Sequence, residues 1–260
     1  MEIMKCKICE SQSDAAFTTA ILKKYEVSYY ECTQCGFVQT EQPYWLEEAY
    51  ANPINVSDTG IVLRNQRLSQ ITTSLIFLFF NRKEKFVDYA GGYGLFTRMM
   101  RDIGFDFYWS DPYTQNLVAR TFEMEAGKKY HLATSFESFE HFERPVLEVA
   151  KILEITDNII LSTELLPNPI PKVSDWWYYG TEHGQHISLY TKKAFIELAR
   201  QFNLHYYSLD NVHLLTKAAL PIHGRLLFQF RYAKHVLYVL SFLIGVFIKS
   251  KTQEDMNKFK

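Results

Sequence analysis

Between residues 85 and 217 the chain alternates strand-like and helix-like segments, and this alternation limits the fold more than any other feature. The strand-like segments are short apolar runs, whereas the helix-like segments repeat apolar residues with a period near 3.6. Strands that alternate with helices form a parallel sheet with crossover helices on its faces. We therefore expect a doubly wound α/β sheet, with an antiparallel hairpin at one edge. The expected strands are residues 85–90, 105–111, 129–136, 157–165, 204–210 and 212–217, and the expected helices are residues 95–104, 115–123, 143–154 and 191–202.

The first of these strands runs into a glycine-rich turn, VDYAGGYGLF (residues 87–96). Such a turn lets backbone N–H groups approach a ligand closely, although a plain tight turn has the same composition. Asp88 precedes the glycines, where it would repel a phosphate. Asp111 ends the next strand, where a carboxylate can hold both hydroxyls of a ribose. This combination favours a cationic ligand with an unphosphorylated ribose, such as S-adenosylmethionine (SAM), over a dinucleotide.

All four cysteines lie near the amino terminus, in two C-x-x-C pairs that are separated by residues 10–31. This spacing predicts a zinc ribbon in which Cys6, Cys9, Cys32 and Cys35 supply four thiolates to Zn²⁺. Strand-like stretches lie between the pairs, and Gly36 can adopt the positive φ of a knuckle. Two disulfides or free thiols are the alternatives. Four thiolates leave no open coordination position, so we expect the zinc to be structural.

The charge balance argues against nucleic acid as a partner. The chain has 28 Lys and Arg residues against 29 Asp and Glu residues, so it has no overall basic field. The amino-terminal segment lacks a long apolar stretch of the kind found in secretory signals. We therefore expect a cytoplasmic location, in which thiols stay reduced.

Five segments together resemble class I SAM-dependent methyltransferases. The likeness is to a bacterial branch with an amino-terminal zinc-binding module, which includes sugar C-methyltransferases and proteins of surface-polysaccharide pathways. It runs from Cys6 to about Lys217. The segments are the two cysteine pairs, VDYAGGYGLFTRMMRD, WSDPY, TSFESFEHFERP and WWYYGTEHGQHISLYT.

The resemblance implies a Rossmann-like fold and a SAM site at the glycine turn. Residues 90–94 would wrap the amino-acid end of the cofactor, Asp111 would hold its ribose, and residues 134–137 would lie beside its adenine. Members of the family usually have glycine where this chain has Ala90, which adds a methyl group to the turn. The expected cofactor-binding residues are Asp88, Ala90, Gly91, Gly92, Tyr93, Gly94, Asp111, Thr134, Ser135, Phe136 and Glu137.

Residues 164–190 form a long aromatic connection between a strand and a helix, and long connections are usually functional. By resemblance, QHISLYT matches the stretch that carries the catalytic histidine of related sugar methyltransferases, which favours His186 as the base. The alternative is that His186 caps the helix expected to start near Thr191. Glu182 and His183 would orient this base or the acceptor, and Tyr179 completes the expected catalytic set. The aromatic rings of this segment either stack on the acceptor or close over the core.

Glu140 and His141 form a second pair of an acid and an imidazole. His141 could face the acceptor, but the acids around it could also favour the amino terminus of the helix that follows. Earlier in the chain, Tyr50, Asp58 and Arg64 match a segment of the resembled family that we expect to fold over the active site.

The carboxyl-terminal segment has no charged side chain between Val236 and Ile248. A membrane span needs about 20 apolar residues, so this run is short for one. It suits a helix in a membrane interface, with contact through residues 234–251, or a helix that packs on the protein or on a second copy. The oligomeric state stays open. The expected divisions are a zinc ribbon (1–40), a helical linker or lid (41–83), the SAM-binding domain (84–217) and an apolar helical tail (218–260).

These features together predict an enzyme that transfers methyl from SAM to a small or glycan-linked acceptor, such as a nucleotide sugar. Two alternatives belong to other classes. The first is a non-catalytic scaffold that binds partners through the ribbon and the tail. The second is an NAD-dependent enzyme, against which Asp88 argues.

Overall fold

A computed structural model describes residues 4–51, 54–55 and 58–258. The first three residues of the expected ribbon, residues 52–53 and 56–57 of the expected linker, and the last two residues of the tail therefore lie outside the described residues. The described part contains two sheets, one from the amino-terminal region and a larger one from the region of alternating strands and helices.

The larger sheet has six strands in the order β10-β11-β8-β7-β5-β6. Four of them, β8, β7, β5 and the edge strand β6, run parallel to one another. The last two strands form an antiparallel hairpin in which β11 also pairs antiparallel with β8. The predicted doubly wound sheet with an edge hairpin is therefore confirmed. Its strands are β5 (Lys85–Tyr89), β6 (Asp106–Ser110), β7 (Leu132–Phe136), β8 (Asn158–Ser162), β10 (His205–Leu209) and β11 (Val212–Thr216).

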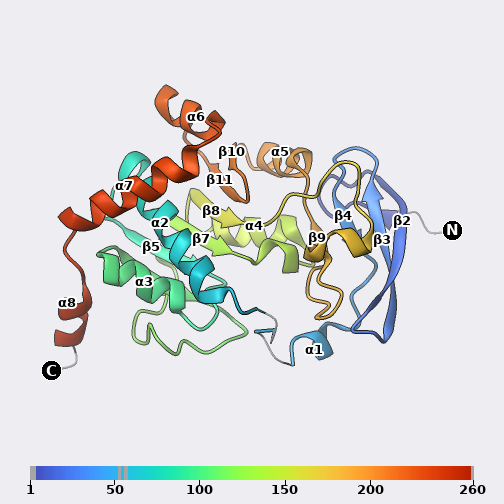
Figure 1. Cartoon of the computed structure of the whole chain (residues 1–260), viewed down its shortest axis with the longest axis horizontal. Coiled ribbons are helices and arrows are strands. Elements are labelled where there is room, and N and C mark those ends of the chain that lie inside the picture. Colours follow the sequence, from blue (N-terminus) through green and yellow to red (C-terminus); the bar gives the residue numbers. More distant parts are fainter. Residues whose placement is uncertain (1–3, 52–53, 56–57, 259–260) are drawn as a thin grey trace.

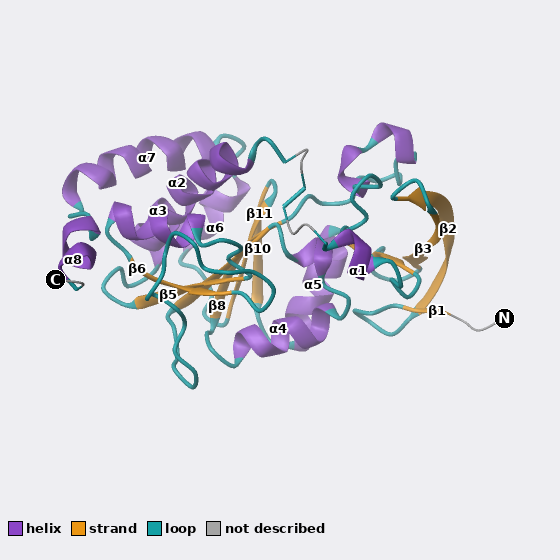
Figure 2. Ribbon diagram, turned by 90° about the horizontal axis from the view of Figure 1, so that it is seen from below, coloured by secondary structure: helices purple, strands orange, loops and turns teal. Residues whose placement is uncertain are grey.

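Helices cover both faces of this sheet (Figures 1 and 2). On one face, α2 and α3 pack with the tail helices around Phe86, Phe107 and Ile160. On the other face, α4 and α5 pack around Val87, Ala133 and Ile159. The strands between these two cores are buried on both faces, which explains their nearly continuous apolar sequences. These helices are α2 (Ile61–Phe79), α3 (Leu95–Ile103), α4 (Pro145–Leu153) and α5 (Lys192–Gln201).

The smaller sheet is built from the cysteine-rich region, but its last strand comes from far along the chain. Its order is β1-β2-β3-β4-β9, and β9 (Ser188–Leu189) pairs with β4 (Val38–Thr40). The connection after β8 therefore joins the amino-terminal sheet to the larger one. The remaining strands are β1 (Met4–Lys5), β2 (Gln12–Ile21) and β3 (Tyr25–Cys32), and a short helix, α1 (Leu46–Ala49), follows β4.

The expected helix at residues 115–123 is wrong. The segment instead makes turns and returns to β6, where Trp109 N–H donates to Phe122 O and Met124 N–H donates to Trp109 O. The Asn116 side chain bonds both the N–H and the carbonyl of Ala119, and this local bonding competes with a helical ladder.

The tail forms three helices, α6 (Ile222–Gln229), α7 (Ala233–Phe247) and α8 (Thr252–Asn257). One face of α7 packs on α2, where the Ser74 hydroxyl donates to Leu237 O at 2.6 Å. The α8 segment is anchored by Asp255, whose carboxylate accepts three hydrogen bonds from Arg98 and Arg101. Among the described residues, no single helix has the length and apolarity to cross a membrane, and only α6 and α7 taken together pass that test, with a bend of 120° between them.

Candidate active site and metal centre

The glycine turn connects β5 to α3 at the carboxyl end of the sheet. It is strongly curved, with positive φ at Ala90 (58°), Gly92 (53°) and Gly94 (86°). A Cβ on Gly91 would lie 2.7 Å from Asp88 Oδ2 and 2.9 Å from the Trp109 ring, and one on Gly94 would lie 2.6 Å from Asn116 Oδ1. The absence of these two side chains is therefore required by the protein's own packing.

Gly92 differs from its neighbours, because a Cβ there would meet no atom within 4 Å. The turn is open at this position, as a backbone that receives a ligand must be. Ala90 has a left-handed backbone conformation, and the resembled family usually has glycine at this position. The Cβ of Ala90 therefore strains the backbone here.

Asp88 lies behind the turn and not on its open side. Its side chain is 2% exposed, and its carboxylate accepts hydrogen bonds from the hydroxyls of Thr134 (2.8 Å) and Thr97 (3.2 Å). Burial raises the pKa of Asp88 to about 7, against the lowering effect of the two hydroxyls. The structure therefore places Asp88 as a support of the turn, and its expected contact with the cofactor stays a prediction.

Asp111 follows β6 and holds the turn from the other side. Its Oδ2 accepts the N–H of Gly92 at 2.9 Å, and its Oδ1 accepts the N–H groups of Tyr113 (2.8 Å) and Thr114 (3.0 Å). The acid and the glycines expected at the SAM site are thus in direct contact. Tyr93 belongs to the same turn, and its carbonyl accepts the N–H groups of Leu117 and Val118.

The end of β7 gives a mixed result for the expected adenine-binding residues. Thr134 and Ser135 are buried, and Ser135 pairs with the Ser138 hydroxyl at 2.7 Å. Phe136 and Glu137 are half-buried, and Phe136 packs edge-on against Phe96. Of the four expected adenine-binding residues, Phe136 and Glu137 are therefore the two with solvent-accessible side chains.

Glu137 directly follows β7 and contacts the end of β8. Its carboxylate accepts the Ser162 hydroxyl at 2.6 Å and lies 3.9 Å from the Arg64 guanidinium. Arg64 in turn makes a two-pronged ion pair with Asp58. Burial, with the nearby Glu140 carboxylate, raises the pKa of Glu137 to about 7.

Three imidazoles meet beside the carboxyl ends of β7 and β8. The His186 ring centroid lies 5.1 Å from that of His141, 4.7 Å from that of His183 and 4.6 Å from that of Tyr178. Burial and the two neighbouring imidazoles hold the pKa of His186 well below its usual range, so its ring is neutral near pH 7. We call His141, His183 and His186 the imidazole cluster.

His186 does not cap the following helix. Its Nδ1 lies 2.6 Å from Tyr178 O, and the cap of α5 is the Thr191 hydroxyl, which accepts the Ala194 N–H. A carbonyl only accepts hydrogen bonds, so Nδ1 carries the proton and Nε2 keeps a free lone pair. His183 is the reverse case, because its Nδ1 accepts the Gln185 N–H and its proton therefore sits on Nε2.

Two residues of the expected catalytic set do not join the imidazole cluster by direct contact. Glu182 is exposed. Tyr179 packs against Phe17 and Tyr29 of the smaller sheet, and its hydroxyl donates to Pro171 O at 2.8 Å. Its neighbour Tyr178 lies at the cluster instead.

Glu140 is the residue that sequence reasoning left unresolved. It sits in a short 3₁₀ helix, Phe139–His141, ahead of α4, so it does not belong to that helix's amino terminus. It is 0% exposed, and neither of its carboxylate oxygens has a hydrogen bond of good geometry among the described residues, although the hydroxyls of Tyr178 and Thr163 lie nearby. Burial raises the pKa of Glu140 to about 7. The only feature of the sequence that pointed to Glu140 is its position next to His141.

Tyr50 lies beside the imidazole cluster. Its ring lies 6.1 Å from that of His141, and the residue is 37% exposed. Partial desolvation, together with the negative charges of Glu140 and Asp111, raises the pKa of Tyr50. That Tyr50, Asp58 and Arg64 fold over the active site stays a prediction.

Residues 63–209, more than half of the chain, match the family described as "Methyltransferase domain". The chain belongs to the methyltransferase domain family. The predicted class of enzyme, a SAM-dependent methyltransferase, is thereby confirmed, and the NAD-dependent alternative is disfavoured. Among curated proteins no significant match is found.

Solved structures agree on the fold. An O-methyltransferase family protein from Burkholderia thailandensis has a TM-score of 0.51 and 12% identity, over 70% of this chain and 65% of that chain. This methyltransferase thus spans slightly less than two thirds of that protein. Weaker similarities are to a SAM-dependent methyltransferase from Thermotoga maritima (TM-score 0.44, 10% identity, 61% and 92% of the two chains) and to magnesium protoporphyrin IX methyltransferase from Synechocystis PCC 6803 (TM-score 0.43, 12% identity, 65% and 90%).

The residues of the methyltransferase fit the SAM that its family implies. The turn is open at Gly92, the amino terminus of α3 follows it directly, and Asp111 stands at the end of the adjacent strand. SAM would supply the methyl group on its sulfonium, and the chain's part is to bind, orient and exclude water.

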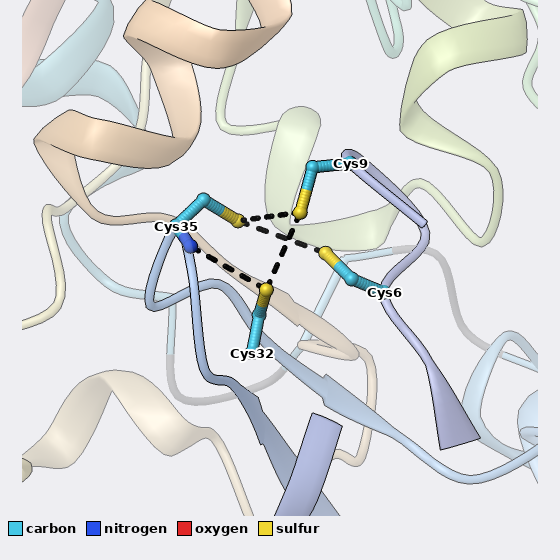
Figure 3. A group of neighbouring side chains, drawn as sticks. All are labelled: Cys6, Cys9, Cys32 and Cys35. Carbon is cyan, nitrogen blue, oxygen red and sulfur yellow. Dashed lines mark hydrogen bonds between the residues drawn. The ribbon is translucent and has the colours of Figure 1, made fainter. Parts of the chain in front are cut away.

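The four cysteines of the methyltransferase lie together, with their thiols pointing toward one another (Figure 3). All four are free thiols and not disulfides. The Sγ atom of Cys9 lies 3.4 Å from that of Cys32 and 3.7 Å from that of Cys35. The Sγ atoms of Cys6 and Cys35 are 3.6 Å apart. Sulfurs bound tetrahedrally at about 2.3 Å from one zinc ion are about 3.8 Å apart.

Backbone N–H groups complete this cysteine site. The N–H of Ile8 points at Cys6 Sγ, and those of Gln34 and Cys35 point at Cys32 Sγ, each at 3.4 Å. Such donors stabilise thiolates, which are the form that binds metal. Gly36 has a φ of 67°, as the second knuckle was expected to require. The donor set therefore fits a structural metal ion.

Proposed function

We propose that the methyltransferase acts on a small or glycan-linked acceptor, such as a nucleotide sugar, and that His186 activates the acceptor. The observation that carries this proposal is the position of the imidazole cluster. His141 follows β7, and the glycine turn follows the adjacent parallel strand β5, so the cluster and the turn lie at the same carboxyl edge of the sheet. A methyl donor at the turn and an acceptor at the cluster would therefore be neighbours.

The chemistry of His186 supports its part in this proposal. Its ring is neutral, its Nδ1–H is fixed by the Tyr178 carbonyl, and its Nε2 lone pair is free. A fixed imidazole with a free lone pair can act on an O–H, N–H or acidic C–H group of the acceptor. His183 directs an N–H instead, which suits it to orient an acceptor oxygen.

The aromatic segment beside the cluster supports an acceptor with a sugar or a base. Trp177 is 76% exposed, and Trp176 is half-buried against Tyr178 and Tyr179. An exposed indole next to a polar cluster provides a flat surface on which a sugar ring or a nucleotide base can stack.

The test is mass spectrometry of nucleotide-sugar and glycan pools incubated with the enzyme and isotope-labelled SAM. We expect one compound to gain one labelled methyl group. His186→Ala should abolish this gain while binding of S-adenosylhomocysteine is retained, and His205→Ala, at an exposed strand end, should behave as the wild type. Undiminished turnover by His186→Ala would contradict the assignment. Absence of any methylated product, together with absence of S-adenosylhomocysteine binding, would favour the non-catalytic scaffold.

We also propose that the cysteine site binds structural zinc. The support is the tetrahedral arrangement of thiols and their N–H donors. With four thiolates the ion would have no free position for water, so its contribution is to the stability of the smaller sheet.

For the tail we propose peripheral contact with an anionic bilayer on the cytoplasmic side. The face of α7 that points away from α2 carries Val239, Phe242, Val246 and Phe247, of which Phe242 and Phe247 are 75% and 83% exposed. Beside Phe247 lies a shallow hollow of about 290 Å³ lined by three cations, Arg82, Lys83 and Lys249. Exposed apolar side chains next to basic groups suit an interface of lipid chains and anionic headgroups.

A further inference from the structure

The imidazole cluster contains a set of ligands for a second metal ion. A carboxylate oxygen of Glu140 and one ring nitrogen each from His141 and His186 all lie within 4.8 Å of one another. Donors bound to one ion at about 2.0–2.2 Å are roughly 3–3.5 Å apart, so side-chain movements of about 1 Å would bring all three onto the ion.

Both imidazoles are fixed in the way that metal-binding histidines usually are. His141 Nδ1 lies 3.0 Å from Gln185 O, and His186 Nδ1 lies 2.6 Å from Tyr178 O. Since carbonyls only accept, both rings carry their proton on Nδ1 and present the Nε2 lone pair. A histidine that binds a metal typically donates its other ring N–H to a carbonyl or carboxylate, which sets the tautomer and the ring orientation.

Glu140 is the independent observation. Buried carboxylates are normally hydrogen-bonded or paired with a cation, since an unpaired one is costly to bury. Glu140 is fully buried, and neither of its oxygens has a hydrogen bond of good geometry among the described residues. The hydroxyls of Tyr178 and Thr163 lie close enough to lower its pKa, but they bond each other at 3.0 Å and carry no positive charge to balance the carboxylate. The nearby cation, Arg64, has its guanidinium committed to Asp58 and lies 3.9 Å from Glu137. A metal ion between Glu140 and the two imidazoles would satisfy this carboxylate.

We propose that Glu140, His141 and His186 bind a divalent first-row transition-metal ion, such as Zn²⁺, Mn²⁺ or Co²⁺. Two imidazoles and one carboxylate are a donor set that such ions accept. Three protein ligands leave at least one position open, in contrast to the closed cysteine site. His183 is not part of the set, because its Nδ1 lone pair already accepts the Gln185 N–H.

An open position at this ion would take an oxygen atom of the acceptor and orient it toward the methyl donor. This consequence rests on the proposed function, whereas binding of the ion does not. With the ion bound, His186 would activate the acceptor through the ion and not by taking its proton directly, because one lone pair cannot hold a metal ion and a proton together.

The experiment is a titration of the full-length, zinc-loaded protein with Co²⁺, followed by calorimetry and visible absorption. One equivalent of Zn²⁺ per chain is added beforehand to fill the four-thiolate cysteine site, and unbound Zn²⁺ is removed, so that the second site is open to Co²⁺. We expect one further equivalent of Co²⁺ per chain, with weak d–d bands and without the intense charge-transfer bands of cobalt thiolates. Glu140→Gln, which keeps the side-chain shape, should weaken this binding at least 100-fold, and His183→Ala should bind as the wild type does.

Absence of a further equivalent in the wild type would overturn the proposal, whether or not the variants fold. Spectra that show only thiolate charge transfer would also overturn it, because they would place the cobalt at the cysteines. Equal binding by Glu140→Gln and wild type would do the same. Binding of S-adenosylhomocysteine and methyl transfer are measured separately, so failure of this site is distinguishable from failure of the proposed function.

Discussion

The carboxylate of Asp111 accepts the backbone N–H of Gly92 at 2.9 Å, and so ties the end of β6 to the glycine turn after β5. Gly92 is also the position of the turn that is open to a ligand. Asp111 therefore has two roles: it maintains the shape of the turn, and it places a negative charge beside the expected ribose site. One substitution of Asp111 would affect both.

Asp111→Asn should weaken binding of S-adenosylhomocysteine at least tenfold, which corresponds to about 1.4 kcal/mol. The amide removes the charge, and its N–H₂ group cannot accept the backbone N–H groups that one carboxylate oxygen of Asp111 accepts in the wild type. Asp157→Asn, at an exposed ion pair with Lys217, should leave the affinity unchanged. Calorimetric titration of both variants checks this, and equal affinities would remove Asp111 from the site.

Ala90→Gly should stabilise the fold by about 1 kcal/mol, because Ala90 has a φ of 58° and a Cβ is strained in the left-handed region. Affinity for S-adenosylhomocysteine should stay the same or increase. Ala150→Gly, within α4, is the matched control and should destabilise by a similar amount. The measurement is denaturant unfolding of the three proteins, and a large loss of affinity in Ala90→Gly would show that the turn geometry is wrong.

The buried Asp88 should make stability fall as the pH rises. Its folded pKa is about 7, whereas an unfolded Asp titrates near 3.9, so the folded form holds more protons between these values. The stabilisation is complete below pH 4 and is lost as the pH rises through 7. Asp88→Asn should abolish this dependence, a difference of roughly 3 kcal/mol between pH 5 and 8. Unfolding free energies of both proteins across that range test it, and parallel curves would refute it.

Cys9→Ser should remove one zinc ion per chain and lower the melting temperature, because three thiolates with a serine hydroxyl bind zinc poorly. The Cys9 sulfur lies 3.4 Å from that of Cys32 and 3.7 Å from that of Cys35. Metal analysis by mass spectrometry together with thermal unfolding checks this prediction. A zinc content of the variant equal to that of the wild type would show that the cysteines are not the ligands.

Phe242→Asp with Phe247→Asp should abolish co-sedimentation with vesicles that contain anionic lipid. Both rings project from α7 and are largely exposed, so their loss should cost little stability. Vesicles of neutral lipid are the control and should bind the wild type more weakly. If the wild type does not bind anionic vesicles but dimerises through this face, the exposed side of α7 contacts a second copy of the chain and not a bilayer.

The parts of the fold that depend on local sequence could be predicted. Strands β5, β7 and β8 are short and mostly apolar, and Gly36, Gly92 and Gly94 have the positive φ that glycine allows. The error at residues 115–123 arises from side-chain bonding, since Asn116 closes on Ala119 in place of a helical turn. Periodicity carries no information about such a contact.

The parts that depend on distant contacts could not be predicted. The strand β9 joins the smaller sheet from far along the chain, and this pairing sets where His186 lies. Glu140 and His141 meet His186 only because residues 163–187 fold over the end of β7, with Ile187 N–H donating to Glu140 O at 2.9 Å. Sequence spacing alone could not distinguish this arrangement from acids at a helix terminus.

The most direct test of the account is a calorimetric titration of the zinc-loaded wild-type protein with S-adenosylhomocysteine and, separately, with NAD⁺. The turn, the carboxylate of Asp111 and membership of the methyltransferase family all predict one bound S-adenosylhomocysteine per chain and no binding of NAD⁺. Binding of NAD⁺, or of neither compound, would contradict it.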